Sequence, residues 1–202
     1  MGPIREAFLV AADSAVALVG EAAVAAAWER PSALAEFRVS GLAGHLARQV
    51  IQAPLVLATP VPDEPPRSLL EQFTGSSWTT APIDDEVNVN VRRKGEREAA
   101  EGHAALVARA AAALEQVRSA LAAEPTDRVV RLPWAEWSLT LDDYLVTRLV
   151  EIAVHNDDLA VSVGLPTPSL PAVVLDPVLD VLTRLAVHRH GPVAVLRALS
   201  RA

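Results

Sequence analysis

The chain has 202 residues, enough for one sizeable hydrophobic core and a single domain. Hydrophobic residues make up 51% and aromatic residues only 4%, so alanine, leucine and valine must fill the interior, which predicts a mostly helical protein. The net charge of −7 argues against nucleic acid as a partner, and the lack of cysteine excludes disulfides, thiolate ligands and a protein thiol nucleophile.

The first predicted element is an apolar helix. The stretch from Ala7 to Ala27 has the composition of a signal peptide, but Asp13 and Glu21 interrupt it and a single arginine precedes it. The same charges exclude a simple membrane span. We therefore expect the first helix of a cytoplasmic protein, beginning near Pro3 and ending before Pro31.

A second helix is predicted to follow a cap at Ser40, whose hydroxyl can accept a hydrogen bond from the first turn. It carries His45 and runs to about Thr59, with a kink expected at Pro54 because proline removes one backbone hydrogen bond. A proline-rich loop over residues 60–66 ends this region.

The middle of the chain carries weaker signals. A short helix is expected over residues 68–73, a surface excursion without helical period over 75–91, and a long helix over 92–123. Residues 128–132 alternate polar and apolar, which indicates a short strand, and 133–137 form a turn.

The last long helix is predicted from its ends. Thr140 followed by Asp143 resembles a capping box, and Gly164 is a typical helix terminator. Residues 176–202 read as two shorter helices divided at Gly191-Pro192. Four long helices of this kind indicate an antiparallel bundle, and bundle interiors commonly build metal sites from facing side chains.

One such site is suggested by Glu151 and His155, which are four residues apart and therefore lie on one helix face. With the imidazole of His45 from another helix, they would supply three ligands to a divalent metal and leave a coordination position open.

A second interpretation is open at this point. The polar sector of this helix is equally compatible with a solvent face, on which its ion pairs would be worth a few tenths of a kcal/mol, and spacing alone favours that view. His45 is equally ambiguous, since polar residues share its face. The sector comprises Tyr144, Thr147, Arg148, Glu151, His155 and Asp158.

The remaining histidines are weaker ligand candidates. His103 is expected to be solvated, and His188 and His190 flank the last helix break, where they could cap carbonyl groups.

Three segments, taken in order, resemble the mycothiol-dependent maleylpyruvate isomerase family. That family belongs to the DinB/YfiT-like superfamily of metal-binding four-helix bundles. The similarity covers most of the chain, although residues 60–123 carry no matching motif. The segments are Trp28-x-x-Pro31-Ser32, Val39-Ser40-Gly41-Leu42-x-x-His45-Leu46 and Thr147-Arg148-Leu149-Val150-Glu151-x-x-Val154-His155-x-Asp157-Asp158-Leu159-Ala160, and Arg189-His190-Gly191 resembles the family's closing segment.

The resemblance implies metal ligands at His45, Glu151 and His155, with zinc favoured and nickel an alternative. It implies that Asp158 orients a ligand imidazole from behind. Asp157 stands where the family commonly has an aromatic ring, a departure that should alter substrate preference. Mycothiol, the small thiol of actinobacteria, is the implied cosubstrate, which suits a chain without cysteine.

The resemblance thus predicts an isomerase or S-transferase that acts on a small electrophile through a metal-bound thiolate. A hydrolase that activates water at the same site, or a non-catalytic helical binding module, remains an alternative. We expect one domain over residues 1–202, with the all-α bundle over about 3–164 and additional short C-terminal helices over about 165–202. A monomer or homodimer is expected, with no nucleic acid or membrane as partner.

Overall fold

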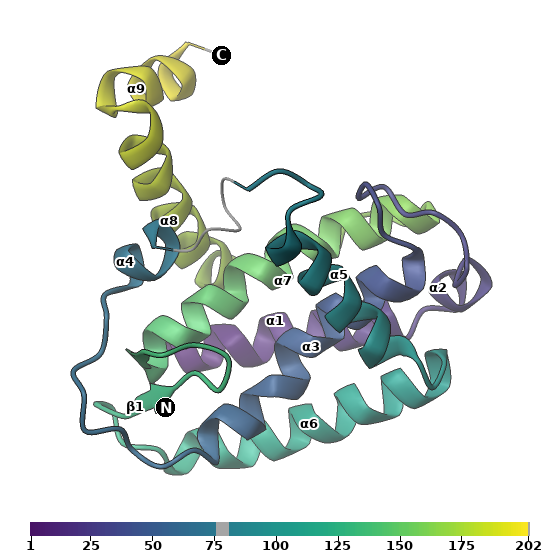
Figure 1. Ribbon diagram of the computed structural model, residues 1–202, viewed down its shortest axis with the longest axis horizontal. Helices are drawn as coiled ribbons and strands as arrows, with labels where there is room; N and C mark the ends of the chain where they lie inside the picture. Colours follow the sequence, from purple (N-terminus) through teal and green to yellow (C-terminus); the bar gives the residue numbers. More distant parts are fainter. Residues whose placement is uncertain (76–80, 202) are drawn as a thin grey trace.

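A bundle of helices forms the body of the molecule (Figure 1). The computed structural model describes residues 1–75 and 81–201. The predicted all-α, DinB-like bundle is confirmed, and its buried faces consist mainly of alanine, valine and leucine. No helix of the described residues is long and apolar enough to cross a membrane. The helices that pack together in the bundle are α1 (Pro3–Val19), α3 (Val39–Leu57), α6 (His103–Ala123) and α7 (Leu141–Val163).

A buried arginine joins three of these helices at one end of the bundle. The Arg5 guanidinium donates to the carbonyl oxygens of Glu124 and Pro125, each at 2.6 Å, and its Nε lies 3.1 Å from Asp142. Carbonyl groups at a helix C-terminus lack partners within the helix. Arg5 supplies such a partner to the Leu121 carbonyl of α6 at 3.4 Å, binds the two carbonyls that follow the helix, and holds the start of α7 against α1.

The predicted first helix is wrong in its extent, because the chain breaks after Gly20 into α1 and the short α2 (Ala22–Ala26). Glu21 is extended at the break. The His103 ring lies 2.7 Å from the carbonyl oxygen of Val19 and edge-on to Trp28, so His103 is not the solvated residue that we expected. In a continuous helix the Val19 carbonyl would accept a hydrogen bond from the next turn. Here the His103 side chain, from a distant helix, is its partner instead.

The second helix begins at Val39, with Arg38 and not Ser40 as its N-cap residue. The first amides of α3 donate to backbone carbonyl groups instead, from Val39 to Arg30 and from Ser40 to Trp28, each at 2.9 Å. The hydroxyl cap is therefore unnecessary. Pro54 lies inside α3, as predicted.

The long helix expected over residues 92–123 is two helices, α5 (Glu86–Ala99) and α6. Gly102, with φ of +89°, turns the chain between them. The Asp85 carboxylate caps α5 by accepting from the amide of Val87, so α5 also occupies part of the predicted surface excursion. Residues 76–80 of that excursion lie outside the described residues. The short α4 (Leu69–Thr74) is capped by Ser68, which forms a capping box with Glu71.

A small hairpin leads into α7. The predicted strand is present as β1 (Val129–Arg131) and pairs antiparallel with β2 (Ser138–Thr140), which the sequence did not indicate. The Thr140 hydroxyl accepts from the amide of Asp143 at 3.0 Å, and Gly164 ends α7 in the left-handed region, as predicted. After α7 come α8 (Ala172–His190) and α9 (Pro192–Ser200), divided at Gly191.

Candidate metal centre

Three side chains that are distant in sequence converge between α3 and α7. His45 Nε2 lies 3.0 Å from Glu151 Oε2, and His155 Nε2 lies 3.4 Å from the same oxygen. The two imidazole rings are edge to face, with centroids 4.7 Å apart. One potential ligand atom from each residue lies within 4.8 Å of the other two, and within residues 1–75 and 81–201 no other trio of this kind occurs.

The position of His45 depends on an unusually close approach of two helices. A Cβ on Gly44 would lie 2.1 Å from the carbonyl oxygen of Gly95, and a Cβ on Gly95 would lie 2.3 Å from that of Gly41. Only glycine lets α5 pass this near to α3. The crossing places α5 directly beside His45, whose Cβ would be 3.2 Å from a Cβ on Gly95.

An ion pair holds the same crossing in place. Glu98 of α5 lies 3.0 Å from the guanidinium of Arg48 on α3 and also accepts a hydrogen bond from Arg109 of α6. All three side chains are partly shielded from solvent, which reduces screening of the pair. The α5 helix is therefore anchored on both sides of the His45 segment.

The polar sector of α7 faces the protein interior, so the solvent-face interpretation is wrong. Tyr144 and Thr147 are buried, and the side chains of Glu151 and His155 are largely shielded. This arrangement follows from the packing of α7 against α1, α3 and α8.

The ring orientation of His155 is set by Asp158. Nδ1 of His155 lies 2.9 Å from Asp158 Oδ2, which leaves Nε2 directed at Glu151. A carboxylate behind an imidazole commonly fixes the tautomer and orientation of a metal-ligating histidine. Asp158 therefore lies where it could orient the His155 ring, and its role stays a prediction.

Two polar residues beside the trio were assigned no role in the sequence-based prediction. Gln49 Nε2 donates to the backbone carbonyl of His45 at 2.9 Å, and Arg148 donates to Gln49 Oε1 at 2.5 Å. Both lie one turn from a trio member, Gln49 from His45 and Arg148 from Glu151. That spacing was visible in the sequence, but only the packing of α3 on α7 shows that the two side chains meet.

Other candidates lie outside the trio. Asp157 is exposed on α7 and accepts a hydrogen bond from the Thr167 hydroxyl, so its carboxylate does not join the His45–His155 pair. Two positions separate it from His155 on the helix, which turns it to the other side. The expected effect of Asp157 on substrate preference thus has no support in the local geometry. His188 and His190 lie in the last turn of α8.

The surroundings of the trio shift the pKa values of its two histidines in opposite directions. Burial lowers the pKa of His45, and the neighbouring Glu151 only partly opposes that effect. Burial also acts to lower the pKa of His155, but hydrogen bonds to Asp158 and Glu151 outweigh it and raise that pKa to about 9. Burial would raise the pKa of Glu151, yet hydrogen bonds to His155 and His45 hold it well below its usual range. Near neutral pH the metal-free trio thus holds a carboxylate, a neutral His45 and a protonated His155.

This donor set fits a divalent metal ion. Two imidazole nitrogens and one carboxylate oxygen are ligand types that zinc accepts, and three protein ligands leave one position open for a water or substrate. The orientation of His155 by Asp158 supplies the supporting contact that such ligands usually have.

Comparison with known proteins bears on the same segments. The mycothiol maleylpyruvate isomerase N-terminal domain family matches residues 9–160, which run from within α1 through nearly all of α7 and include the whole trio. No curated protein and no solved structure matches the chain significantly. Since the match covers three quarters of the sequence, the chain belongs to the mycothiol maleylpyruvate isomerase N-terminal domain family.

Proposed function

We propose that this protein is a metal- and thiol-dependent enzyme in which His45, Glu151 and His155 hold a divalent ion, zinc in preference to nickel. The observation that carries the proposal is the convergence of both imidazole Nε2 atoms on one carboxylate oxygen, with Asp158 behind His155. Membership of a mycothiol-related family supports a small thiol as the cosubstrate.

Each residue has a defined task in this proposal. When bound, the ion supplies an open position at which a thiol loses its proton and becomes a nucleophile towards a small electrophile. The three ligands hold the ion at the boundary of α3 and α7, and Asp158 keeps Nε2 of His155 directed towards it. Gln49 fixes the His45 backbone carbonyl and receives Arg148, which stiffens the wall of the site.

The chain has no thiol of its own, so the nucleophile comes from a small molecule, for which mycothiol is the proposed identity. Release of the thiol after rearrangement would make the enzyme an isomerase, whereas release of the conjugate would make it an S-transferase. Both reactions need the same ligand trio and the same open position.

The decisive experiment measures metal and thiol binding separately. Purified protein is stripped with a chelator and titrated with zinc, and a mycothiol mimic is then added to the metal-free and zinc-loaded forms. We expect one zinc per chain, and thiol binding only after zinc. His155→Ala should abolish tight zinc binding, whereas His188→Ala, at an exposed histidine near the end of α8, should leave it unchanged.

Three outcomes contradict the proposal. If zinc binds with unchanged affinity after His155→Ala and after His45→Ala, these two histidines are not the metal ligands. Zinc binding without any effect on thiol binding, combined with hydrolysis that needs no thiol, would favour the hydrolase. Failure to bind either zinc or thiol would favour a non-catalytic binding module.

A further inference from the structure

The C-terminal arm, defined here as α8 and α9, extends away from the bundle (Figure 1). The α8 helix packs against α1, α4 and α7 along a stripe made of Val174, Val178, Val181 and Leu185. The α9 helix packs against α8, yet none of its nine residues is buried. Helices shorter than about 12 residues are marginal in water unless an apolar face is covered. The packing on α8 alone therefore leaves α9 without the burial that a stable helix of its length requires.

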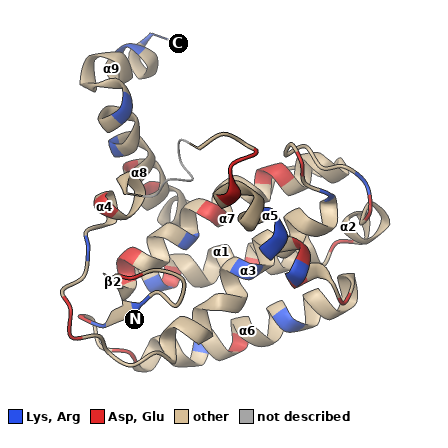
Figure 2. Cartoon of the chain, viewed as in Figure 1, with Lys and Arg blue, Asp and Glu red and all other residues tan. Residues whose placement is uncertain are grey.

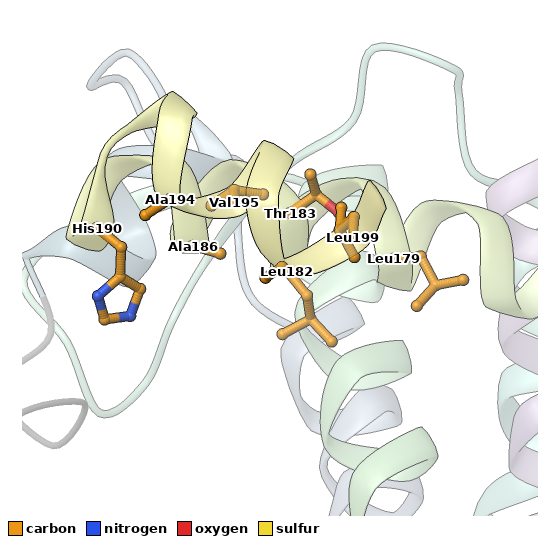
Figure 3. A pocket seen from close by; sticks show the side chains of 9 residues that line it. Leu179, Leu182, Thr183, Ala186, His190, Ala194, Val195 and Leu199 are labelled. Carbon is orange, nitrogen blue, oxygen red and sulfur yellow. The ribbon is translucent and has the colours of Figure 1, made fainter. Parts of the chain in front are cut away.

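A second apolar stripe on α8 is only partly covered, because α9 of the same chain lines one side of it and leaves the other side open. Its spacing of four, three and four residues is the spacing of a helix–helix seam. The stripe continues into an open groove of about 410 Å³ between α8 and α9 (Figure 3). In this groove Leu179 of α8 is 56% exposed and Leu199 of α9 is 72% exposed. Leu196 of α9, which does not line the groove, is 66% exposed. Several large apolar side chains exposed along one arm indicate an interaction surface. The stripe consists of Leu175, Leu179, Leu182 and Ala186.

The charges of the arm are segregated along its length (Figure 2). Asp176 and Asp180 lie in the first half of α8, which contains no lysine or arginine. The second half of α8 and the segment after it contain only basic charges, at Arg184, Arg189, Arg197 and Arg201. Asp180 pairs with Arg184 at 2.9 Å. Among the described residues, no carboxylate pairs with Arg189 or Arg197.

We propose that the arm binds the arm of a second copy of this chain in an antiparallel, two-fold symmetric pair. In this arrangement the acidic half of each α8 faces the basic half of the other, and the exposed leucines cover each other. A parallel pair would instead place like charges together. A two-fold interface requires a self-complementary surface, and the arm meets that condition in its charge, with acidic residues at one end of α8 and basic residues at the other.

The first test is the mass of the full chain in solution, measured by sedimentation velocity over a wide concentration range. We expect a dimer that dissociates on dilution. Leu182→Glu and Leu196→Glu, on the two helices of the arm, should each shift the protein to monomer. The matched control is Leu55→Glu, because Leu55 is an exposed leucine of α3 outside the arm, and this variant should remain a dimer. Zinc affinity should be the same in all four proteins, which separates the arm from the metal centre.

The second test addresses orientation. A variant with Asp176→Arg and Asp180→Arg, and another with Arg189→Asp and Arg197→Asp, should each be monomeric because both contacts then join like charges. An equimolar mixture should form a heterodimer. Persistence of the wild-type dimer in Leu182→Glu and Leu196→Glu would overturn the proposal, as would a wild-type monomer at every concentration. A dimer unaffected by either charge variant would overturn the antiparallel arrangement.

Discussion

Substitution of one glycine should separate α3 from α5 and thereby disturb the candidate metal centre. A Cβ on Gly44 would lie 2.1 Å from the carbonyl oxygen of Gly95 and 3.2 Å from the amide nitrogen of Ala99. Ordinary contact begins near 3.4 Å, so α5 must retreat by about 1.3 Å, because the obstructing atoms belong to the backbone. Overpacking of this kind costs about 1–3 kcal/mol.

Gly41→Ala is a matched control on the same helix. A Cβ there would meet only the side chains of Glu96 and Phe37, at 3.5 and 3.6 Å. Both substitutions gain about 1 kcal/mol of helix propensity, which cancels when the two variants are compared. The free energy of unfolding of Gly44→Ala should therefore fall below that of Gly41→Ala by about 1–3 kcal/mol.

Urea unfolding of the metal-free variants measures this difference, and zinc titration measures its effect on the site. Gly44→Ala should bind zinc more weakly than Gly41→Ala, since residue 44 precedes the ligand His45 and α5 packs beside it. Equal stability of the two variants would refute the reasoning that the glycine contact sets the distance between α3 and α5.

Three further predictions concern the site. Because the pKa of His155 is about 9 in the metal-free protein, zinc must displace a proton below that pH. The affinity for zinc should fall about tenfold for each pH unit below 9. Calorimetry near pH 7 in buffers of different ionisation enthalpy should detect about one proton released per zinc bound. Release of no proton would contradict the protonated state of His155. Asp158→Asn should weaken zinc binding about 10–100-fold, and Asp157→Asn, on the exposed side of α7, should not, as judged by competition with a chelating dye. Tyr144→Phe should not destabilise the protein, since the Tyr144 hydroxyl is buried without a hydrogen-bond partner among the described residues; a loss above about 1 kcal/mol in urea unfolding would indicate a partner.

Helix ends were predictable where the signal was local. Thr140 caps α7 through an amide three residues away, and Gly164 ends it by adopting a conformation that glycine favours. The break at Gly20 was not predictable, because the partner of the Val19 carbonyl is His103, which is 84 residues away in the chain. Ser40 likewise failed as a cap because distant carbonyl groups already serve the first turn of α3.

In the candidate site, too, contacts within one helix turn were predictable and the contact between distant segments was not. The spacing of Glu151 and His155 placed them on one helix face, and that of His155 and Asp158 brought the carboxylate within reach of the ring. The motifs that resemble the family added His45, but no spacing rule relates residues 106 positions apart.

By itself the sequence determined the helical composition, the ends of α7, the absence of a protein thiol and the pairing of residues within one turn. Each of these depends on the chemistry of neighbouring residues. Only the tertiary structure decided that the polar sector of α7 faces inward, because that depends on which surfaces α3 and α8 cover. It also decided that Gly44 and Gly95 meet and that His45 reaches Glu151, since contacts between distant segments arise only when helices pack together.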